Sequence, residues 1–371
     1  MENQFDERSP LYHFRTLVDP RVERTRLHAL TDIVFLTIMA VLSGADGWVG
    51  VEEFGKERED WLRKHLDLPA GIPSHDTIGN VMGRICPEAF EACFLSWINA
   101  IAQVGEQEIV AIDGKTLRKS YDKGSSKAAI HMVSAWANTN ELILGQVKVD
   151  DKSNEITAIP RLIEALFLEG ALVTIDAMGC QKAIVSSIID KQADYLISLK
   201  GNQSTLHQQV MYSFENQSCK QIEEEIDYGH GRIEERRCSV ITDLKWIEET
   251  KAWKGLKSIV KLDSQRHDLN KGETQRETRY YISSLKQDAT LINKAIRSHW
   301  AIENKVHWIL DVAFREDDSR IRQGNAAQNF SVIRRIALNL LKNYGSSKIG
   351  IQNKRLKIAW NPDKLLDVLK N

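Results

Sequence analysis

The chain has 371 residues, of which 42% are hydrophobic and 27% are charged. This composition supports a buried core, predicts about two or three domains, and excludes a disordered or collagen-like protein. Its 50 basic and 51 acidic side chains nearly cancel, which argues against a basic protein that coats a polymer. The charge is uneven, because residues 320–371 carry 11 basic and two acidic side chains. This basic end fits either a polyanion-binding segment or a solvated basic helix.

The cysteines show neither a zinc-finger nor a disulfide pattern. The chain contains Cys86, Cys93, Cys180, Cys219 and Cys238. This odd number, with no CxxC pair, indicates a reducing compartment. The most apolar stretch, residues 33–45, is too short to cross a bilayer and lies too far along the chain for a signal peptide. We therefore expect a core helix, no membrane contact and a cytoplasmic protein.

Residues 27–104 have the apolar spacing of helices. Ser74 or Asp76 can cap one of them, and Pro87 stands where the first turn of a helix tolerates proline. Short helices joined by a tight turn would form a helix-turn-helix in which residues 77–84 read DNA. Because the region is acidic, a helical bundle without DNA contact is the alternative.

Strands and helices alternate after residue 108. The segments EIVAIDGK, AIHMVSAWA and LILGQVKVD predict three strands, and residues 155–167 have helical spacing. The segments ALVTIDAMG and ADYLISLK predict two more strands, each followed by a helix. Residues 217–284 are charged and alternating, with glycine turns typical of hairpins. We expect an antiparallel β insertion there, and helices after it.

Two aspartates follow apolar runs, Asp113 in the first predicted strand and Asp176 in the fourth. A carboxylate at a strand end leaves the core and is still held rigidly, so ligands bind there. If these strands are neighbours, the carboxylates converge and a cation must offset their repulsion. Oxygen ligands without His or Cys favour Mg²⁺ or Mn²⁺, and two ions about 3.5–4 Å apart suit phosphoryl displacement. An ordinary turn or helix cap is the alternative.

A third carboxylate would hold the second ion. The late helical segment offers Glu303, Asp311, Glu316, Asp317 and Asp318. Glu303 shares one helical face with His299 and His307, because each is four residues away. That face is either a solvated surface or the phosphate-facing wall of a cleft.

The segments IDGKTLRKS, KSNEITAIP, TIDAMGCQ, LKGNQ, HWAIENKVHW and RIRQGNAAQNFSVIRRIALNLLK resemble DDE transposases of the ISAs-type, H-repeat-associated family of bacterial insertion sequences. The resemblance covers about residues 10–345. It implies an α/β fold in which an RNase H-like catalytic core, residues 105–345, is interrupted by a β-rich insertion at about 217–284. An all-helical domain, residues 1–104, would precede the core, and a basic tail, residues 346–371, would follow it.

The resemblance implies that the catalytic and metal-binding residues are Asp113, Asp176 and Glu303, with Mg²⁺ or Mn²⁺ as two ions. Hairpin-forming transposases that share the insertion carry Tyr, Arg, Glu and Lys around the last acid. This chain has Ile296, His299, Glu303 and Leu310 at those places. His299 or its neighbour Arg297 would then contact phosphate in place of the Arg.

Other side chains are expected to contact DNA. Lys115 and Lys200 follow the first and fifth strands closely enough to neutralise phosphate charge, unless they are merely solvated. Asn202 and Gln203 can donate hydrogen bonds to backbone or bases. Trp300 either stacks on an unpaired base or packs in the core through its helical spacing. The arginines expected to contact phosphate beside the last amphipathic helix are Arg320, Arg322, Arg334 and Arg335.

The resemblance implies a DNA transposase that cuts DNA at insertion-sequence ends and transfers the freed 3′-OH to target DNA. Its expected partners are double-stranded DNA, at element ends and target, and a second copy of the chain in a synaptic homodimer. We expect it to act at the nucleoid of a bacterium. The alternatives are an RNase H-fold nuclease without joining activity and a non-catalytic DNA-binding remnant of a mobile element.

Overall fold

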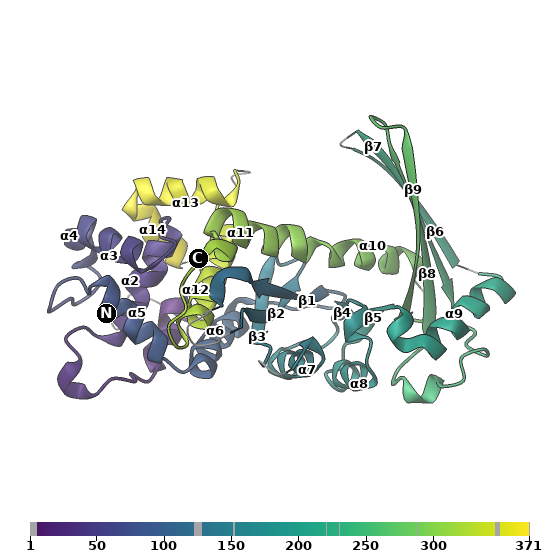
Figure 1. The fold of residues 1–371 in the computed structure, drawn as a ribbon, viewed down its shortest axis with the longest axis horizontal. Helices are drawn as coiled ribbons and strands as arrows, with labels where there is room; N and C mark the ends of the chain where they lie inside the picture. Colours follow the sequence, from purple (N-terminus) through teal and green to yellow (C-terminus); the bar gives the residue numbers. More distant parts are fainter. Residues whose placement is uncertain are drawn as a thin grey trace.

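The computed structural model describes residues 6–121, 128–150, 153–219, 221–229, 231–286, 288–345 and 349–370. The molecule is elongated, with a helical body at one end, a sheet through its middle and a β arm at the other end (Figure 1). Within the described ranges, no helix is long and apolar enough to cross a membrane.

The N-terminal region is helical, as predicted. Its helices are α1 (Pro10–His13), α2 (Leu30–Leu42), α3 (Trp48–Glu57), α4 (Glu59–Leu62), α5 (His75–Arg84) and α6 (Pro87–Ile101). The hydroxyl of Ser74 caps α5 by accepting a hydrogen bond from Thr77 N, and Pro87 begins α6. α2 is buried almost all round because α3, α12 (Ala326–Asn343) and α13 (Ile351–Trp360) contact it. The expectation of a core helix is confirmed.

α5 is packed between other helices. Ile78, Val81 and Met82 are buried where α5 meets α3 and α12. Gly83 approaches the backbone of Gln323 so closely that an added Cβ would lie 3.1 Å from its carbonyl oxygen. This packing favours the helical bundle over a DNA-reading helix for residues 77–84.

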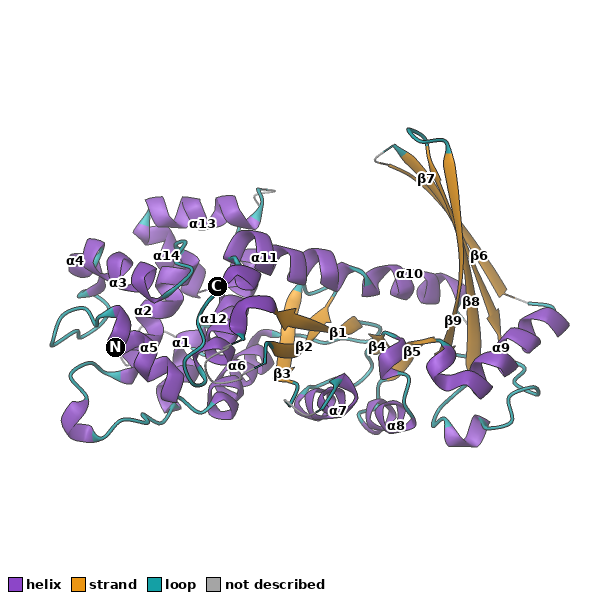
Figure 2. Ribbon diagram, viewed as in Figure 1, coloured by secondary structure: helices purple, strands orange, loops and turns teal. Residues whose placement is uncertain are grey.

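Nine strands of the described chain form one mixed sheet (Figure 2). They are β1 (Ile109–Leu117), β2 (Ile130–Ala137), β3 (Leu142–Lys148), β4 (Leu172–Ile175), β5 (Asp194–Leu199), β6 (Gln221–Gly229), β7 (Arg232–Ile241), β8 (Ser258–Asp268) and β9 (Glu273–Ser283). Their order across the sheet is β3-β2-β1-β4-β5-β9-β8-β7-β6. β4 is parallel to β1 and β5, whereas the other neighbours are antiparallel. The condition that the first and fourth strands are neighbours is met, because β1 pairs with β4.

Asp113 does not end its strand, which corrects the sequence-based expectation. Pairing of β1 with β4 stops at Ile112, opposite Ile175. Pairing of β1 with β2 continues to Leu117. Asp113 therefore lies inside a strand, at the point where the neighbour on one side has ended. The open edge beside it comes from the unequal lengths of its two neighbours.

Helices cover both faces of the sheet (Figure 1). α7 (Glu155–Ala165) contacts β2 and β3, and α8 (Lys182–Asp190) contacts β5. α10 (Ala289–His299) contacts β1 and β4 and continues toward the arm, where it meets β6 and β7. α9 (Ser204–Asn216) contacts β9. α10 thus connects the central strands with the arm.

The arm consists of β6 to β9, and it confirms the predicted antiparallel hairpins. It is not a separate sheet, however, because β9 pairs with β5 from Leu199–Tyr280 to Leu196–Ser283. Arm and central strands therefore share one continuous hydrogen-bonded sheet (Figure 2).

The C-terminal part contains a π-helix (Glu303–His307), α11 (Trp308–Phe314), α12, α13 and α14 (Pro362–Lys370). Arg334 and Arg335 are 2% and 0% exposed, so the expectation that they contact DNA from the margin of α12 is wrong. Arg335 Nη1 lies 2.9 Å from the buried Glu316 Oε1, and Arg334 Nη1 lies 4.0 Å from it. α12 is enclosed by α2, α5, α6 and β3, which leaves it no solvated margin. Arg355 is also internal and donates to Val41 O.

Candidate active site

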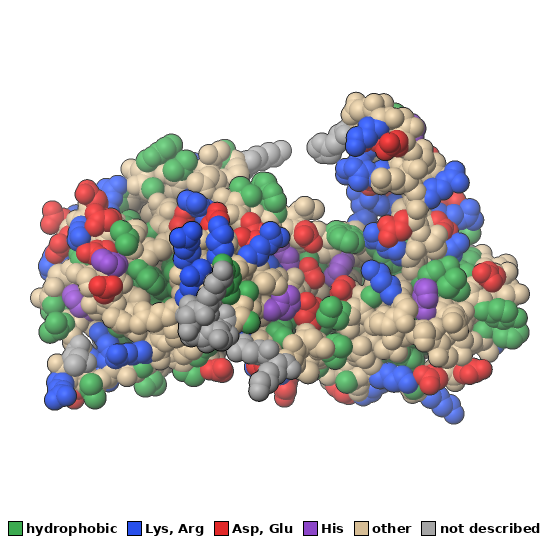
Figure 3. Space-filling view, viewed as in Figure 1, with side chains coloured by type: hydrophobic (Ala, Val, Ile, Leu, Met, Phe, Trp, Pro, Cys, Tyr) green, Lys and Arg blue, Asp and Glu red, His purple; other side chains and the backbone are tan. Residues whose placement is uncertain are grey.

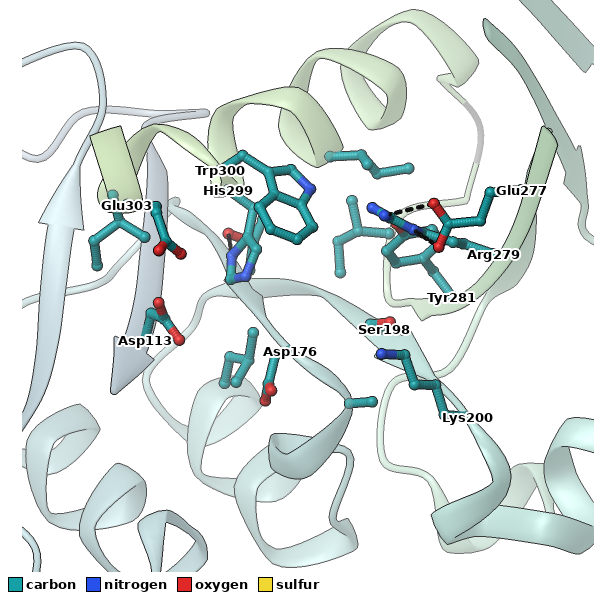
Figure 4. Close-up of a pocket in the computed structure, with 16 residues that line it drawn as sticks. Asp113, Asp176, Ser198, Lys200, Glu277, Arg279, Tyr281, His299, Trp300 and Glu303 are labelled. Atoms are coloured by element: carbon teal, nitrogen blue, oxygen red, sulfur yellow. Dashed lines mark hydrogen bonds and ion pairs between the residues drawn. The ribbon is translucent and has the colours of Figure 1, made fainter. Parts of the chain in front are cut away.

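A cavity of about 270 Å³ lies beside the end of β4, under the helical segment that follows α10 (Figure 4). The three predicted acids, Asp113, Asp176 and Glu303, all line it. They come from β1, from the residue after β4 and from the π-helix. The fold therefore brings the three segments to one place, although they are far apart in the sequence.

Asp113 lies where negative charge is concentrated. Burial, together with the nearby carboxylates of Glu155, Asp176 and Glu303, raises the pKa of Asp113 to about 7. A hydrogen bond from Gly114 N acts in the opposite direction. A bound cation would relieve this repulsion, which is the electrostatic requirement for a metal site.

Asp176 acts as a helix cap and also faces the cavity. Its Oδ1 accepts hydrogen bonds from Met178 N at 2.9 Å and Gly179 N at 3.3 Å, at the start of a short 3₁₀ helix (Ala177–Gly179). The helix-cap alternative is therefore correct for Asp176. These bonds fix the carboxylate rigidly at the end of β4, so the cap also orients it in the cavity.

Glu303 belongs to a tight cluster that includes a histidine. Ligand atoms of Asp113, Glu303 and His307 all lie within 4.8 Å of one another. His307 Nδ1 is 3.6 Å from Asp113 Oδ2, and its buried Nε2 has no hydrogen-bond partner among the described residues. Burial lowers the pKa of His307 to about 3, so the imidazole is neutral at pH 7 and can coordinate a metal. Two carboxylates and a neutral imidazole fit a divalent cation.

The metal-binding expectation is thus modified in two ways. Asp176 lines the cavity but is not part of this tight cluster. His307, which the sequence placed only on the same face as Glu303, is part of it. The sequence does contain a signal for it, since His307 lies four residues after Glu303. It was not considered a metal ligand because only oxygen ligands were expected.

Glu155 is a second residue that sequence reasoning missed. Its Oε1 lies 2.6 Å from His131 Nε2, and it packs so closely on β1 that a Cβ added to Gly114 would lie 2.1 Å from it. The residue stands in KSNEITAIP, but nothing in that motif alone shows that α7 begins beside Asp113.

Lys115 does not have the solvated position expected of a phosphate contact. Its side chain is 8% exposed, and its Nζ lies 2.7 Å from both carboxylate oxygens of Asp311 and 3.3 Å from Asp317 Oδ1. These two acids, which were candidates for the third metal ligand, neutralise the lysine instead. The expectation that Lys115 neutralises DNA phosphate is therefore wrong.

Asn202 and Gln203 hold the loop beside Asp176. Asn202 Nδ2 donates to Ala177 O at 2.7 Å, and Gln203 Nε2 donates to Cys180 O at 2.9 Å. These amides, expected to donate to DNA, instead donate to the backbone that carries the Asp176 carboxylate. Lys200, in contrast, lines the cavity and points into it (Figure 4).

The residues around Glu303 differ in their availability to a ligand. His299 Nδ1 lies 3.1 Å from Thr174 Oγ1. This contact orients the imidazole ring of His299 against β4. Trp300 is 49% exposed and lines the cavity, so the core alternative is wrong for it. Arg297 is ion-paired with Glu225 and Asp227 of β6, and therefore ties α10 to the arm.

The two remaining arginines lie before α12. Arg320 is exposed. Arg322 is half-buried, donates to Lys119 O at 3.1 Å and lies 5.1 Å above the ring of Tyr121. Neither residue lines the cavity, so a role of either in DNA binding would concern a different surface.

Comparison with known proteins gives concordant results. The family described as "Transposase DDE domain" matches residues 105–340, and the family described as "DDE_Tnp_1-associated" matches residues 11–98. YncI of Escherichia coli O157:H7 is 45% identical over 97% of this chain and 94% of its own length. The H repeat-associated protein YhhI of Escherichia coli (strain K12) is 42% identical over 96% of both chains. The names of both proteins include the word transposase.

Among solved structures, a piggyBac transposase synaptic complex with hairpin DNA has a TM-score of 0.49 and 10% identity, over 99% of this chain and 80% of that chain. The family matches cover most of the sequence, and the chain belongs to the DDE transposase family. The predicted H-repeat-associated resemblance and the RNase H-like α/β fold are thereby confirmed. The protein is a DNA transposase, and divalent-metal use follows from its family.

Proposed function

We propose that this transposase cuts the phosphodiester bond at insertion-sequence ends with Asp113, Asp176 and Glu303 as its catalytic carboxylates, and that His307 completes the metal site. One observation carries the proposal. The three acids line a single cavity, and the ligand atoms of Asp113, Glu303 and His307 lie within 4.8 Å of one another. Asp176 faces the same cavity from the end of β4.

Two divalent cations, Mg²⁺ or Mn²⁺, fit these residues. Asp113, Glu303 and His307 would hold one ion, and Asp113 with Asp176 would hold the other. When bound, such ions activate water and stabilise the leaving oxygen of an in-line displacement.

The reaction has two steps. In the first, the oxygen of a water forms a bond to phosphorus, the bond from phosphorus to the 3′-oxygen breaks, and the 3′-oxygen takes up a proton. In the second, the oxygen of the resulting 3′-OH forms a bond to a phosphorus of the target DNA and loses its proton, while the bond from that phosphorus to its own 3′-oxygen breaks and the released 3′-oxygen takes up a proton. Neither step needs a covalent enzyme intermediate, so no Ser or Tyr nucleophile is required.

Residues on the opposite wall would hold the DNA strand. Lys200 places positive charge across the cavity from Glu303, beside the ion pair of Arg279 and Glu277 (Figure 4). The exposed ring of Trp300 is available for stacking on an unpaired base at the cut, a contact worth roughly 1–3 kcal/mol. Two element ends processed together require two active sites, so we further propose a homodimer on paired double-stranded DNA ends and target.

The test is Mg²⁺- or Mn²⁺-dependent cleavage and strand transfer on duplexes taken from the DNA that flanks the gene. Asp113→Asn, Asp176→Asn and Glu303→Gln should each lower cleavage by at least about 10²-fold, equivalent to about 2.7 kcal/mol. Glu248→Gln, an exposed acid away from the cavity, should cleave normally. Wild-type cleavage by one triad variant would remove that residue from the proposal. Cleavage without joining would indicate a nuclease, and DNA binding without cleavage would indicate a remnant.

A further inference from the structure

The cluster of Asp113, Glu303 and His307 joins two parts of the chain that are far apart in the sequence. Asp113 comes from β1, whereas Glu303 and His307 come from the π-helix, which continues directly into α11. The carboxylates of Asp113 and Glu303 also repel each other across this contact. An attraction elsewhere between β1 and the helical segment must therefore oppose the repulsion.

Lys115 links the same two parts through a buried ion pair. Its Nζ lies 2.7 Å from both carboxylate oxygens of Asp311 on α11. It also lies 3.3 Å from Asp317 Oδ1, in the 3₁₀ helix that follows α11. The lysine side chain is 8% exposed. Separating a buried ammonium from its carboxylates leaves a poorly solvated charge, which is strongly unfavourable. The pair therefore resists any separation of α11 from β1.

The ion pair and the metal-ligand cluster are neighbouring contacts between one strand and one helical segment. Lys115 follows Asp113 by two residues, so both side chains lie on one face of β1, about 7 Å apart along the strand. Asp311 follows His307 by four residues, so both lie on one face of the helix, about 6 Å apart along its axis. These spacings nearly agree. Asp113 therefore meets His307, at 3.6 Å, while Lys115 meets Asp311.

Other ion pairs around this contact are more exposed. Lys119 is paired with Asp318, and Lys305 of the π-helix is paired with Glu141. These four side chains are between 41% and 51% exposed. Figure 3 shows basic and acidic side chains beside one another at the surface around α11. Exposed pairs contribute little because solvent screens them, so the buried pair of Lys115 is the stronger link.

We propose that Lys115 is a positioning residue of the active site, whose buried ion pair with Asp311 holds Glu303 and His307 within reach of Asp113. This inference rests on the proposed function, because it gives Lys115 a part in assembling the metal site. In this role Lys115 acts on the ligands through Asp311 and does not itself touch the metal or the DNA. Substitution of residues that orient metal ligands costs roughly 10–100-fold in metal affinity.

The test measures Mn²⁺ affinity by isothermal titration calorimetry in the full-length protein. Lys115→Met keeps the length of the side chain and removes its charge, and we expect it to weaken Mn²⁺ binding by about tenfold. Asp311→Asn removes the other partner and leaves Lys115 its contact with Asp317, so this variant keeps a counter-charge and should fold. The double variant should lose no more affinity than Lys115→Met alone, because both substitutions break the same contact.

Lys56→Met on α3 is the matched control. Lys56 also meets two carboxylates, at 2.8 and 2.9 Å, but its side chain is 53% exposed and does not line the cavity. It should bind Mn²⁺ as wild type does. Hydrogen exchange measured without metal adds a second readout. Peptides from residues 303–314 should exchange faster in Lys115→Met than in wild type, and unchanged in Lys56→Met. Circular dichroism checks that all variants are folded.

If wild type binds Mn²⁺ and both single variants bind it equally well, the inference is overturned and the proposed metal site stands. Additive losses in the double variant would also overturn it, because Lys115 and Asp311 would then act separately. If wild type binds no Mn²⁺, the proposed metal site fails and hydrogen exchange decides. Faster exchange of residues 303–314 in Lys115→Met would then support the hold of Lys115 on this segment, and equal exchange would overturn it.

Discussion

At the scale of single residues, His307 changes the chemistry expected of the site. An imidazole beside Asp113 and Glu303 is a softer ligand than a third carboxylate. It also carries no charge, so it adds a ligand without adding to the repulsion among the acids. The softer nitrogen ligand favours Mn²⁺ over Mg²⁺ at this position relative to an all-carboxylate site.

We expect His307→Ala to weaken Mn²⁺ binding by at least about tenfold, because metal-site substitutions beyond the ligands already cost 10–100-fold. Isothermal titration calorimetry with Mn²⁺ and Mg²⁺ measures the effect, and the loss should be larger for Mn²⁺. His267→Ala on the arm, far from the cavity, is the control. An unchanged Mn²⁺ affinity in His307→Ala would show that the histidine is not a ligand.

The residues that sequence reasoning located correctly share a simple signal. Asp113 and Asp176 each follow an apolar run, and such a run indicates a buried strand, although it did not show that β1 continues past Asp113. The sequence around Lys115 and Arg334 does not show whether their side chains are solvated. A basic residue near a motif has the same sequence neighbours whether it is exposed to solvent or paired with a buried acid. Asp311 and Glu316, which hold them, are about 200 and 18 residues away in the chain. Pairing at such distances is set by the tertiary fold alone.

At the scale of elements, α12 depends on a buried carboxylate. Glu316 lies in the short 3₁₀ helix (Glu316–Asp318) between α11 and α12 and is fully buried against Arg334 and Arg335. Burial alone raises the pKa of Glu316, but the guanidiniums of Arg335 and Arg334 outweigh it and hold the pKa below its usual range. The carboxylate is therefore charged in the folded protein.

We expect Glu316→Gln to destabilise the fold by about 3–5 kcal/mol, because it leaves two guanidiniums buried without a counter-charge. Urea denaturation of wild type and variant measures the difference. Asp318→Asn, two residues away and 51% exposed, should change stability by less than about 1 kcal/mol. If Glu316→Gln lowered the free energy of unfolding as little as Asp318→Asn does, the buried carboxylate would not be structurally important.

α6 supplies a pH-dependent contribution through Glu91. Burial raises the pKa of Glu91 to about 8, with Glu88 adding to the rise and Arg335 and Arg161 opposing it. The folded protein thus binds a proton that the unfolded chain releases near its ordinary pKa of about 4.5. The contribution to stability is fully present below that pH and is lost as the pH rises toward 8, by at most about 1.4 kcal/mol per pH unit.

Glu91→Gln should therefore be more stable than wild type at pH 8 and nearly equal to it at pH 5. Urea denaturation at several pH values in this window would reveal the difference. The exposed Glu57→Gln on α3 serves as a matched control and should follow wild type at each pH. A constant difference between Glu91→Gln and wild type would contradict the assignment.

Local pattern determined most elements but not their connections. The alternation of residues 217–284 correctly predicted hairpins, because it depends on neighbouring residues. The same pattern did not show that β9 pairs with β5, since four ladder pairs decide that contact between segments about 84 residues apart. Likewise, the apolar run before Asp113 indicated a strand but not its continuation along β2.

At the scale of the whole molecule, the N-terminal helices and the catalytic part share one core. α12 contacts α2, α5 and α6, and Asn329 Nδ2 donates to Met82 O and Ile85 O. Residues on both sides of the predicted boundary at residue 104 therefore belong to one continuous hydrophobic core. The domain limits given by the sequence stay a prediction.

We expect a chain that lacks residues 1–104 to aggregate, because Phe330, Ile333 and other apolar side chains of α12 would lose their cover. Size-exclusion chromatography and circular dichroism of this fragment, beside the full chain, would measure the outcome. A monomeric fragment that unfolds cooperatively would show that the rest of the chain folds without the N-terminal helical region.

The continuity of the sheet has a mechanical consequence. β9 is bonded to β5 and β5 to β4, and Asp176 follows the last residue of β4. The tip of the arm, more than six residues beyond this junction, is linked to the residue before Asp176 through two rows of inter-strand hydrogen bonds. The arm is thus coupled to the end of β4 by continuous backbone pairing, and a displacement of the arm would be transmitted to Asp176.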